Sequence, residues 1–76
     1  MRTVNVYLHR SIVNTSERGV DLVSGFAAVV HGGRVLSSAD LSPALVLVRV
    51  EVADADVEQF TADLDANDAV ESYTAR

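Results

Sequence analysis

The chain has 76 residues, of which 49% are hydrophobic, and a net charge of −5 from eleven acidic residues against six arginines and no lysine. This length fits one small domain spanning residues 1–76, and the apolar content excludes a disordered chain. No stretch supplies the basic stripe that a general nucleic-acid binder needs. The apolar run of residues 44–48 is far too short to cross a membrane.

The absence of cysteine excludes a disulfide and a thiolate metal site. A core of this size contributes only ~3–5 kcal/mol, so either marginal stability or stability borrowed from a partner is expected. The acidic, lysine-free composition fits a high-salt cytosol or a GC-rich genome equally well. No secretory segment of ~7–15 apolar residues follows Met1, which predicts a cytoplasmic protein if the chain is the full gene product.

Residues 3–9 alternate strictly between apolar and other side chains, which predicts a half-buried strand with Val4, Val6 and Leu8 on one face. Residues 14–16 are helix-capping types, and apolar residues then recur at three- and four-residue spacing. This pattern predicts one amphipathic helix that ends at glycines 32 and 33. Two further glycines inside the helix suggest close approach to the sheet.

The second half predicts two strands, a helix and a last strand. Residues 34–41 form the weaker strand, and residues 45–52, with four valines on one face, form the best strand in the chain. Asp54 is the expected cap of a helix that buries Val57, Phe60 and Leu64. After a turn, residues 69–75 read as a strand with Val70 inward and Glu71 and Tyr73 outward.

The element order strand, helix, strand, strand, helix, strand predicts an α+β, ferredoxin-like βαββαβ fold. It has a four-stranded antiparallel sheet with two helices on one face, in the usual strand order 4-1-3-2. The valine faces then lie under the helices, and the other face stays open to water. The side chains expected on the open face are Asn5, Tyr7, His9, Leu45, Leu47, Arg49, Glu51, Glu71 and Tyr73.

An apolar patch on an open sheet face, formed here by Tyr7, Leu45, Leu47 and Tyr73, tends to mark a protein interface. The alternative is ordinary scattered surface leucines or a register displaced by one residue. We therefore predict a protein interface made by Tyr7, Leu45, Leu47, Arg49 and Tyr73.

No residue pattern indicates catalysis or metal binding. The two histidines, His9 and His31, have no ligand spacing around them, and no serine lies in a nucleophile elbow. The paired aromatics of an RNA-recognition motif and the glycine-rich anion loop of an acylphosphatase are also missing. The prediction is a protein without enzymatic activity, metal or cofactor.

Several short motifs between residues 30 and 74 resemble the propeptide domains of subtilisin-type serine proteases and their free-standing inhibitor relatives. They are Gly32-Gly33-Arg34-Val35, Ser42-Pro43-Ala44, the acidic-capped helix with Phe60 and Leu64, and Ala69-Val70-Glu71-Ser72-Tyr73. The resemblance implies an open sheet face that packs on two surface helices of a protease. It also implies an acidic residue, Asp40 in the connection between the second and third strands, that caps those helices. A C-terminal tail, Thr74, Ala75 and Arg76, would enter the active-site cleft if the last strand ends early.

Two hypotheses for the function follow. The first is a non-enzymatic protein-binding domain that resembles subtilisin propeptides and acts as a protease inhibitor or folding chaperone. The second is a small intracellular module that forms a homodimer through the open face and binds a small regulatory ligand. The partner is a subtilisin-type serine protease in the first hypothesis and a second copy of the chain in the second.

Overall fold

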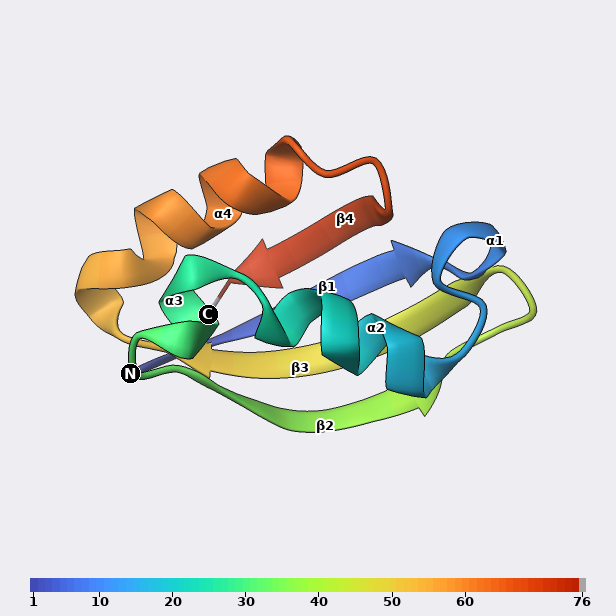
Figure 1. The fold of residues 1–76 in the computed structure, drawn as a ribbon, viewed down its shortest axis with the longest axis horizontal. Helices are drawn as coiled ribbons and strands as arrows, with labels where there is room; N and C mark the ends of the chain where they lie inside the picture. Colours follow the sequence, from blue (N-terminus) through green and yellow to red (C-terminus); the bar gives the residue numbers. More distant parts are fainter. Residues whose placement is uncertain (76) are drawn as a thin grey trace.

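The computed structural model describes residues 1–75, and it confirms the α+β class with four antiparallel strands in one open sheet beside a layer of helices (Figure 1). This arrangement is compatible with a ferredoxin-like βαββαβ fold. The elements in chain order are β1 (Arg2–His9), α1 (Arg10–Val13), α2 (Ser16–Ser24), α3 (Ala27–Val30), β2 (Arg34–Asp40), β3 (Leu45–Val52), the 3-10 helix η1 (Asp54–Asp56), α4 (Val57–Asp65) and β4 (Val70–Ala75).

The strands lie in the order β2-β3-β1-β4, which is the order expected from the sequence. The central strands β1 and β3 pair over their whole length, with Val6 opposite Val48 and Tyr7 opposite Leu47. Directly opposed residues of an antiparallel pair share a face of the sheet. The register therefore assigns every residue of these two strands to one face or the other.

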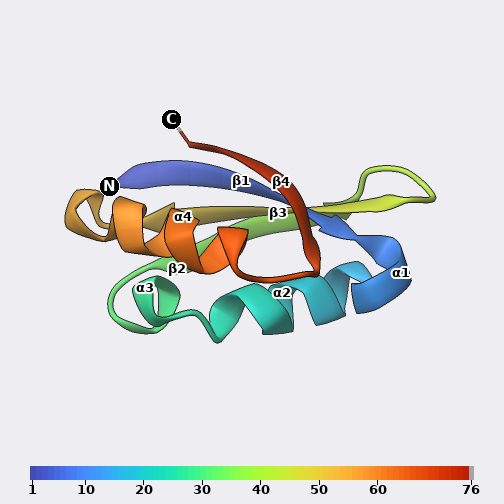
Figure 2. The same cartoon turned by 90° about the horizontal axis from the view of Figure 1, so that it is seen from above.

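The helices cover one face of the sheet only. In Figure 2, α2, α3 and α4 lie on the same side of the strands, and no described segment covers the opposite side. α2 packs over β2 and β3, while α4 packs against β4. Among the described residues, no helix has the length and apolar character needed to cross a membrane.

The core lies between the helices and the covered face. The valines and the leucine that β1 and β3 direct to this face are fully buried, with 0% of their surface exposed. The helices contribute Phe60 and Leu64 from α4 and Val23 from α2, and the ring of Phe26 meets the ring of Phe60 edge-on with centroids 5.7 Å apart. Burial of this apolar surface is the main stabilising contribution to a domain without disulfides.

The first helical segment departs from the prediction, because the chain forms two helices instead of one. α2 ends at Gly25, whose N–H donates to the carbonyl of Leu22, and Phe26 is extended, with φ −71° and ψ 143°. The break lets the Phe26 ring reach Phe60. The close approach expected at Gly19 is confirmed, since a Cβ there would lie 3.0 Å from Cδ1 of Leu8.

The predicted helix ends are only partly right. Thr15 caps α2 as expected, because its hydroxyl accepts a hydrogen bond of 3.2 Å from the N–H of Arg18. Asp54 does not cap α4. It begins the 3-10 helix that precedes α4, and its carboxylate lies 3.2 Å from the amino group of Met1.

Both edge strands contain an irregularity that the sequence did not reveal. In β2 the pairing with β3 shifts between Val35 and Ser37, which leaves Leu36 without a partner. In β4 the pairing with β1 passes from Val70 directly to Ser72, which leaves Glu71 without one. Each extra residue reverses the side-chain alternation beyond it.

Candidate functional site

The open face of the sheet is the candidate site, and the register gives its composition row by row. One row runs across β2, β3, β1 and β4 through Ala39, Leu47, Tyr7 and Ser72. Beside it, Leu45 of β3 is opposite His9 of β1. These side chains lie at or near one end of the sheet, which is the end beside α1 and the β2–β3 connection.

Three of the predicted interface residues, Tyr7, Leu45 and Leu47, are partly exposed and lie together on this face. Ala39 joins them from β2, beside Leu47. We call these four residues the apolar patch. Ala39 was missed in the sequence because the extra residue at Leu36 hides the alternation of β2.

The other half of the open face is polar. Arg49 Nε donates to Oδ1 of Asn5 across the β1–β3 pair, at 3.3 Å. Arg34 Nε lies 3.2 Å from Oε1 of Glu51, which is an ion pair between β2 and β3. Arg49 therefore lies on the predicted face, but it belongs to the polar half and not to the apolar patch.

Tyr73 does not belong to the open face, and that prediction is wrong. It is opposite Val6, a buried residue of the covered face, and it packs against the core. The extra residue Glu71 reverses the alternation of β4, so that Ser72 and Thr74 take the open positions instead.

The hydroxyl of Tyr73 is directed to the helix layer, where it donates to Oδ2 of Asp65 on α4 at 3.0 Å. This hydrogen bond and the negative charge of the carboxylate raise the pKa of Tyr73 above its ordinary value of 10.0. Tyr73 therefore ties β4 to α4 instead of contributing to a binding surface.

The predicted C-terminal tail is not free over its described part. Thr74 pairs with Asn5 and Ala75 with Val4, so both are residues of β4. Arg76 lies outside the described residues. The early end of the last strand that an inhibitory tail requires is therefore contradicted at positions 74 and 75.

Asp40 is the last residue of β2 and not part of the connection after it. It is opposite Val46, a buried residue of the covered face, so it does not share the open face with the apolar patch. Its carboxylate already has a partner, because Nη1 of Arg10 lies 3.3 Å away. The structure thus separates Asp40 from the surface with which it was expected to act.

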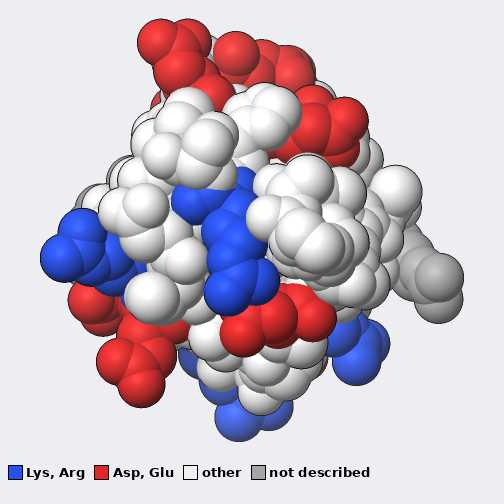
Figure 3. Space-filling model, turned by 90° about the vertical axis from the view of Figure 1, so that its right-hand side faces the viewer, with Lys and Arg blue, Asp and Glu red and all other residues white. Residues whose placement is uncertain are grey.

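Charge is distributed unevenly over the two sides of the sheet. Of the eleven acidic residues, only Glu51 lies on the open face, with Glu71 at its edge, and Arg34 and Arg49 balance them. Most of the other acidic residues belong to the helices and the segments around them. Figure 3 views the end with α1 and the β2–β3 connection, and acidic side chains gather at its top, on the side of α4. The open face is therefore close to neutral on a strongly acidic protein.

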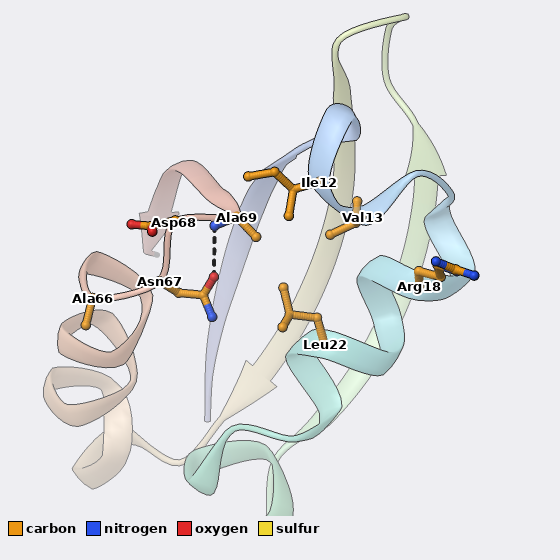
Figure 4. Close-up of a pocket in the computed structure, with 8 residues that line it drawn as sticks. All are labelled: Ile12, Val13, Arg18, Leu22, Ala66, Asn67, Asp68 and Ala69. Atoms are coloured by element: carbon orange, nitrogen blue, oxygen red, sulfur yellow. Dashed lines mark hydrogen bonds between the residues drawn. The ribbon is translucent and has the colours of Figure 1, made fainter.

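A second concave surface lies on the helix side, where α1, α2 and the α4–β4 turn meet (Figure 4). Its volume is about 510 Å³, and Ile12, Leu22 and Ala69 give it an apolar lining. The side chains of Arg18 and Asp68 point away from its centre. The amide of Asn67 reaches toward the groove, and its Oδ1 already accepts a hydrogen bond of 2.9 Å from the N–H of Ala69. A typical ligand site has several convergent polar groups.

The described residues contain no group of three or more histidine, cysteine, aspartate or glutamate side chains that could hold a metal ion. His9 lies at the end of β1 opposite Leu45, and His31 follows α3 at the other end of the sheet. The structure therefore does not bring the two histidines together.

No protein-family model matches the sequence, and no curated protein matches it either. The similarity to subtilisin propeptides therefore depends on the short motifs alone.

Proposed function

We propose that this chain is a non-enzymatic protein-binding domain and that the open sheet face is its binding surface. The observation that carries the proposal is the contrast between the two faces of one sheet. The helices completely bury the inward valines and leucine of the central strands β1 and β3, whereas Tyr7, Leu45, Leu47 and Ala39 form an apolar patch that no described segment covers. A contiguous apolar area with a polar border is typical of interaction sites.

The arrangement of the patch also fits an interface. The apolar residues occupy one half of the face, and the hydrogen-bonded pair Arg49–Asn5 and the ion pair Arg34–Glu51 occupy the other half. Interfaces commonly combine an apolar centre with a polar rim, and arginine is enriched in them. Strands hold all these side chains, so the surface is formed before a partner arrives.

A subtilisin-type protease is the partner that the propeptide resemblance suggests, and the open sheet face is the feature of the chain that favours it. Because Thr74 and Ala75 lie in β4 and Asp40 pairs with Arg10, binding would depend on the face itself. The protease would be bound or chaperoned at its surface helices, without a contribution from these three residues to inhibition.

The test is a substitution in the centre of the patch. Leu47→Asp places a charge opposite Tyr7 without touching the core, and we expect it to abolish binding to a panel of subtilisin-type proteases and self-association alike. Binding is followed by titration of protease activity, and self-association by sedimentation. Circular dichroism checks that the variant is folded.

Val30→Asp is the matched control, because Val30 is 63% exposed in α3 on the helix side and receives the same charge. Loss of binding in Leu47→Asp but not in Val30→Asp supports the proposal. Equal behaviour of the two variants, or a parent chain that binds neither a protease nor itself, would reject the open face as the binding surface.

A further inference from the structure

We infer that the occupant of the open face is a second copy of this chain, packed face to face with Leu47 of one copy over Tyr7 of the other. This inference rests on the proposed function, since it uses the same surface and names the partner. Three features of the molecule support it: the balance of charge on the face, its size, and the division of the face into an apolar and a polar half.

The first feature is electrostatic. The chain carries a net charge of −5, so two copies repel one another over most orientations. The open face is an exception, because Arg34 and Arg49 balance Glu51 and Glu71 there. Two copies can therefore meet at this face without net repulsion, and the acidic helix layers then point away from each other.

The second feature is area. The four strands, of six to eight residues each, span a face of about 24 by 19 Å, given ~3.3 Å per residue and ~4.8 Å between strands. Two such faces cover about 900 Å² together, close to the ~1,000 Å² at which specific protein interfaces begin. A sheet-on-sheet dimer of this small domain therefore lies at the lower limit of size for a specific interface, and it would bury the whole apolar patch.

The third feature fixes the orientation. A twofold axis across the strands would lay the apolar half of one copy on the polar half of the other. An axis parallel to the strands, between β1 and β3, lays the apolar half on the apolar half and the polar half on the polar half. It places β3 over β1 of the other copy, and β2 over β4. Tyr7 and Leu47 are directly opposite each other in the sheet. Tyr7 of each copy therefore lies over Leu47 of the other copy.

The same axis brings Arg49 of one copy over Asn5 of the other. Glu51, two residues further along β3, then lies over Thr3 of the second copy, its partner in the register of the sheet. The polar halves therefore match Arg49 with Asn5 and Glu51 with Thr3, in the reciprocal way that a twofold interface requires. Ser72 and Thr74 of β4 face Ala39 and Ser37 of β2 across the interface, with small side chains on both sides.

The arrangement is tested by complementation between two variants. Tyr7→Arg and Leu47→Glu each place a charge in the centre of the interface, and each should weaken the homodimer by at least about thirtyfold, the loss typical of a central contact. An equal mixture should restore a one-to-one heterodimer. In that mixture the new guanidinium meets the new carboxylate at one of the two central contacts, and the other contact stays native.

Cross-linking is the second measurement, and it does not depend on how well the charged variants fold. The chain has no cysteine, so Tyr7→Cys and Leu47→Cys can be joined by a short bis-maleimide. Both positions flank the axis, about half a strand spacing from it, so we expect a cross-linked dimer from each single variant and from the mixture. Val30→Cys, at an exposed site on the helix side, is the control and should give no cross-linked dimer.

The outcomes separate the inference from the proposed function. A heterodimer that forms only in the mixture, with cross-links at positions 7 and 47 but not at position 30, supports the inferred arrangement. A parent chain that dimerises but shows no complementation and no cross-link at positions 7 and 47 overturns it. A monomeric parent that binds a protease through Leu47 also overturns it and leaves the proposed function standing, whereas a chain that does neither overturns both.

Discussion

The two faces of the sheet come from the same strands, yet they have different roles. In β3 the residues Val46, Val48, Val50 and Val52 are fully buried under the helices, while Leu45, Leu47, Arg49 and Glu51 alternate with them on the open face. The covered face supplies the apolar core of the fold, and its polar residues, such as Ser38 and Asp40, lie at its border in β2. The open face combines an apolar patch with ionic and hydrogen-bonded pairs.

This difference shows how a small domain divides its apolar residues. A chain of 76 residues without disulfides has little stability to spare, and still it exposes Tyr7, Leu45 and Leu47 on the open face. Moving these residues under the helices would require a shift of register, which would expose the valines instead. We therefore expect the open face to tolerate substitution without loss of the core.

The largest expected difference between the two faces is in stability, and two neighbouring residues of β3 test it. We expect Val48→Asp to unfold the domain, because a buried carboxylate without a partner costs about 4 kcal/mol or more, roughly the whole stability of so small a core. Leu47→Asp should cost less than about 1 kcal/mol, because its side chain stays at the surface. Urea denaturation followed by circular dichroism measures both.

The measurement is made at a concentration at which the parent chain is monomeric, since dimerisation would add to the apparent stability of the parent. Similar destabilisation in the two variants would break the comparison. It would mean that the open face is part of the structural core and not a separate binding surface.

The sequence predicted the central strands well because both alternate without interruption. The boundaries expected for β3, residues 45–52, are those observed, and all three apolar residues assigned inward in β1 are buried. In a strictly alternating strand each side chain points to one of two faces, and the helices must cover the more apolar face. The apolar patch followed directly for the residues of these two strands.

The edge strands could not be predicted in the same way. An extra residue such as Glu71 leaves no mark in the sequence, because β4 still reads as an alternating strand when it is counted from Val70. The error placed Tyr73 on the wrong face. Asp40 was misplaced for a related reason, since its position depends on the irregularity at Leu36 and on an ion pair with Arg10, thirty residues earlier in the chain.

A smaller effect is expected at the junction between the helix layer and the sheet. A Cβ on Gly33 would lie 2.7 Å from the carbonyl oxygen of Ala28 and 2.8 Å from that of Glu51. Both are backbone atoms, so Gly33→Ala must displace either the end of α3 or the edge of β3. We expect a loss of about 1–3 kcal/mol in the free energy of unfolding, measured by urea denaturation.

Gly25→Ala is the matched control on the same layer. Gly25 has φ −82°, and the nearest atom to an added Cβ is 3.5 Å away. Alanine should therefore stabilise the domain by about 0.4–1 kcal/mol, because it restricts the unfolded chain. If both substitutions changed the free energy of unfolding in the same direction, close packing at Gly33 would not explain the result.

The smallest effect concerns Tyr73, and it tests on which face this residue belongs. Its hydrogen bond to Asp65 raises its pKa, which means that folding favours the protonated phenol. The stabilisation is present below the pKa of the unfolded chain and is lost as the pH rises through the higher pKa of the folded state. Stability should therefore fall at alkaline pH by a component that Tyr73→Phe removes.

Ultraviolet titration of the phenolates and urea denaturation between neutral and alkaline pH measure this component. Asp65→Asn should lower the pKa of Tyr73 toward its ordinary value, because the amide carries no charge. In the proposed dimer, neither substitution should change self-association, since Tyr73 faces the helices. A Tyr73→Phe variant with unchanged alkaline stability but weakened dimerisation would return Tyr73 to the open face, and it would remove the reversed alternation on which the separation of the two faces in β4 depends.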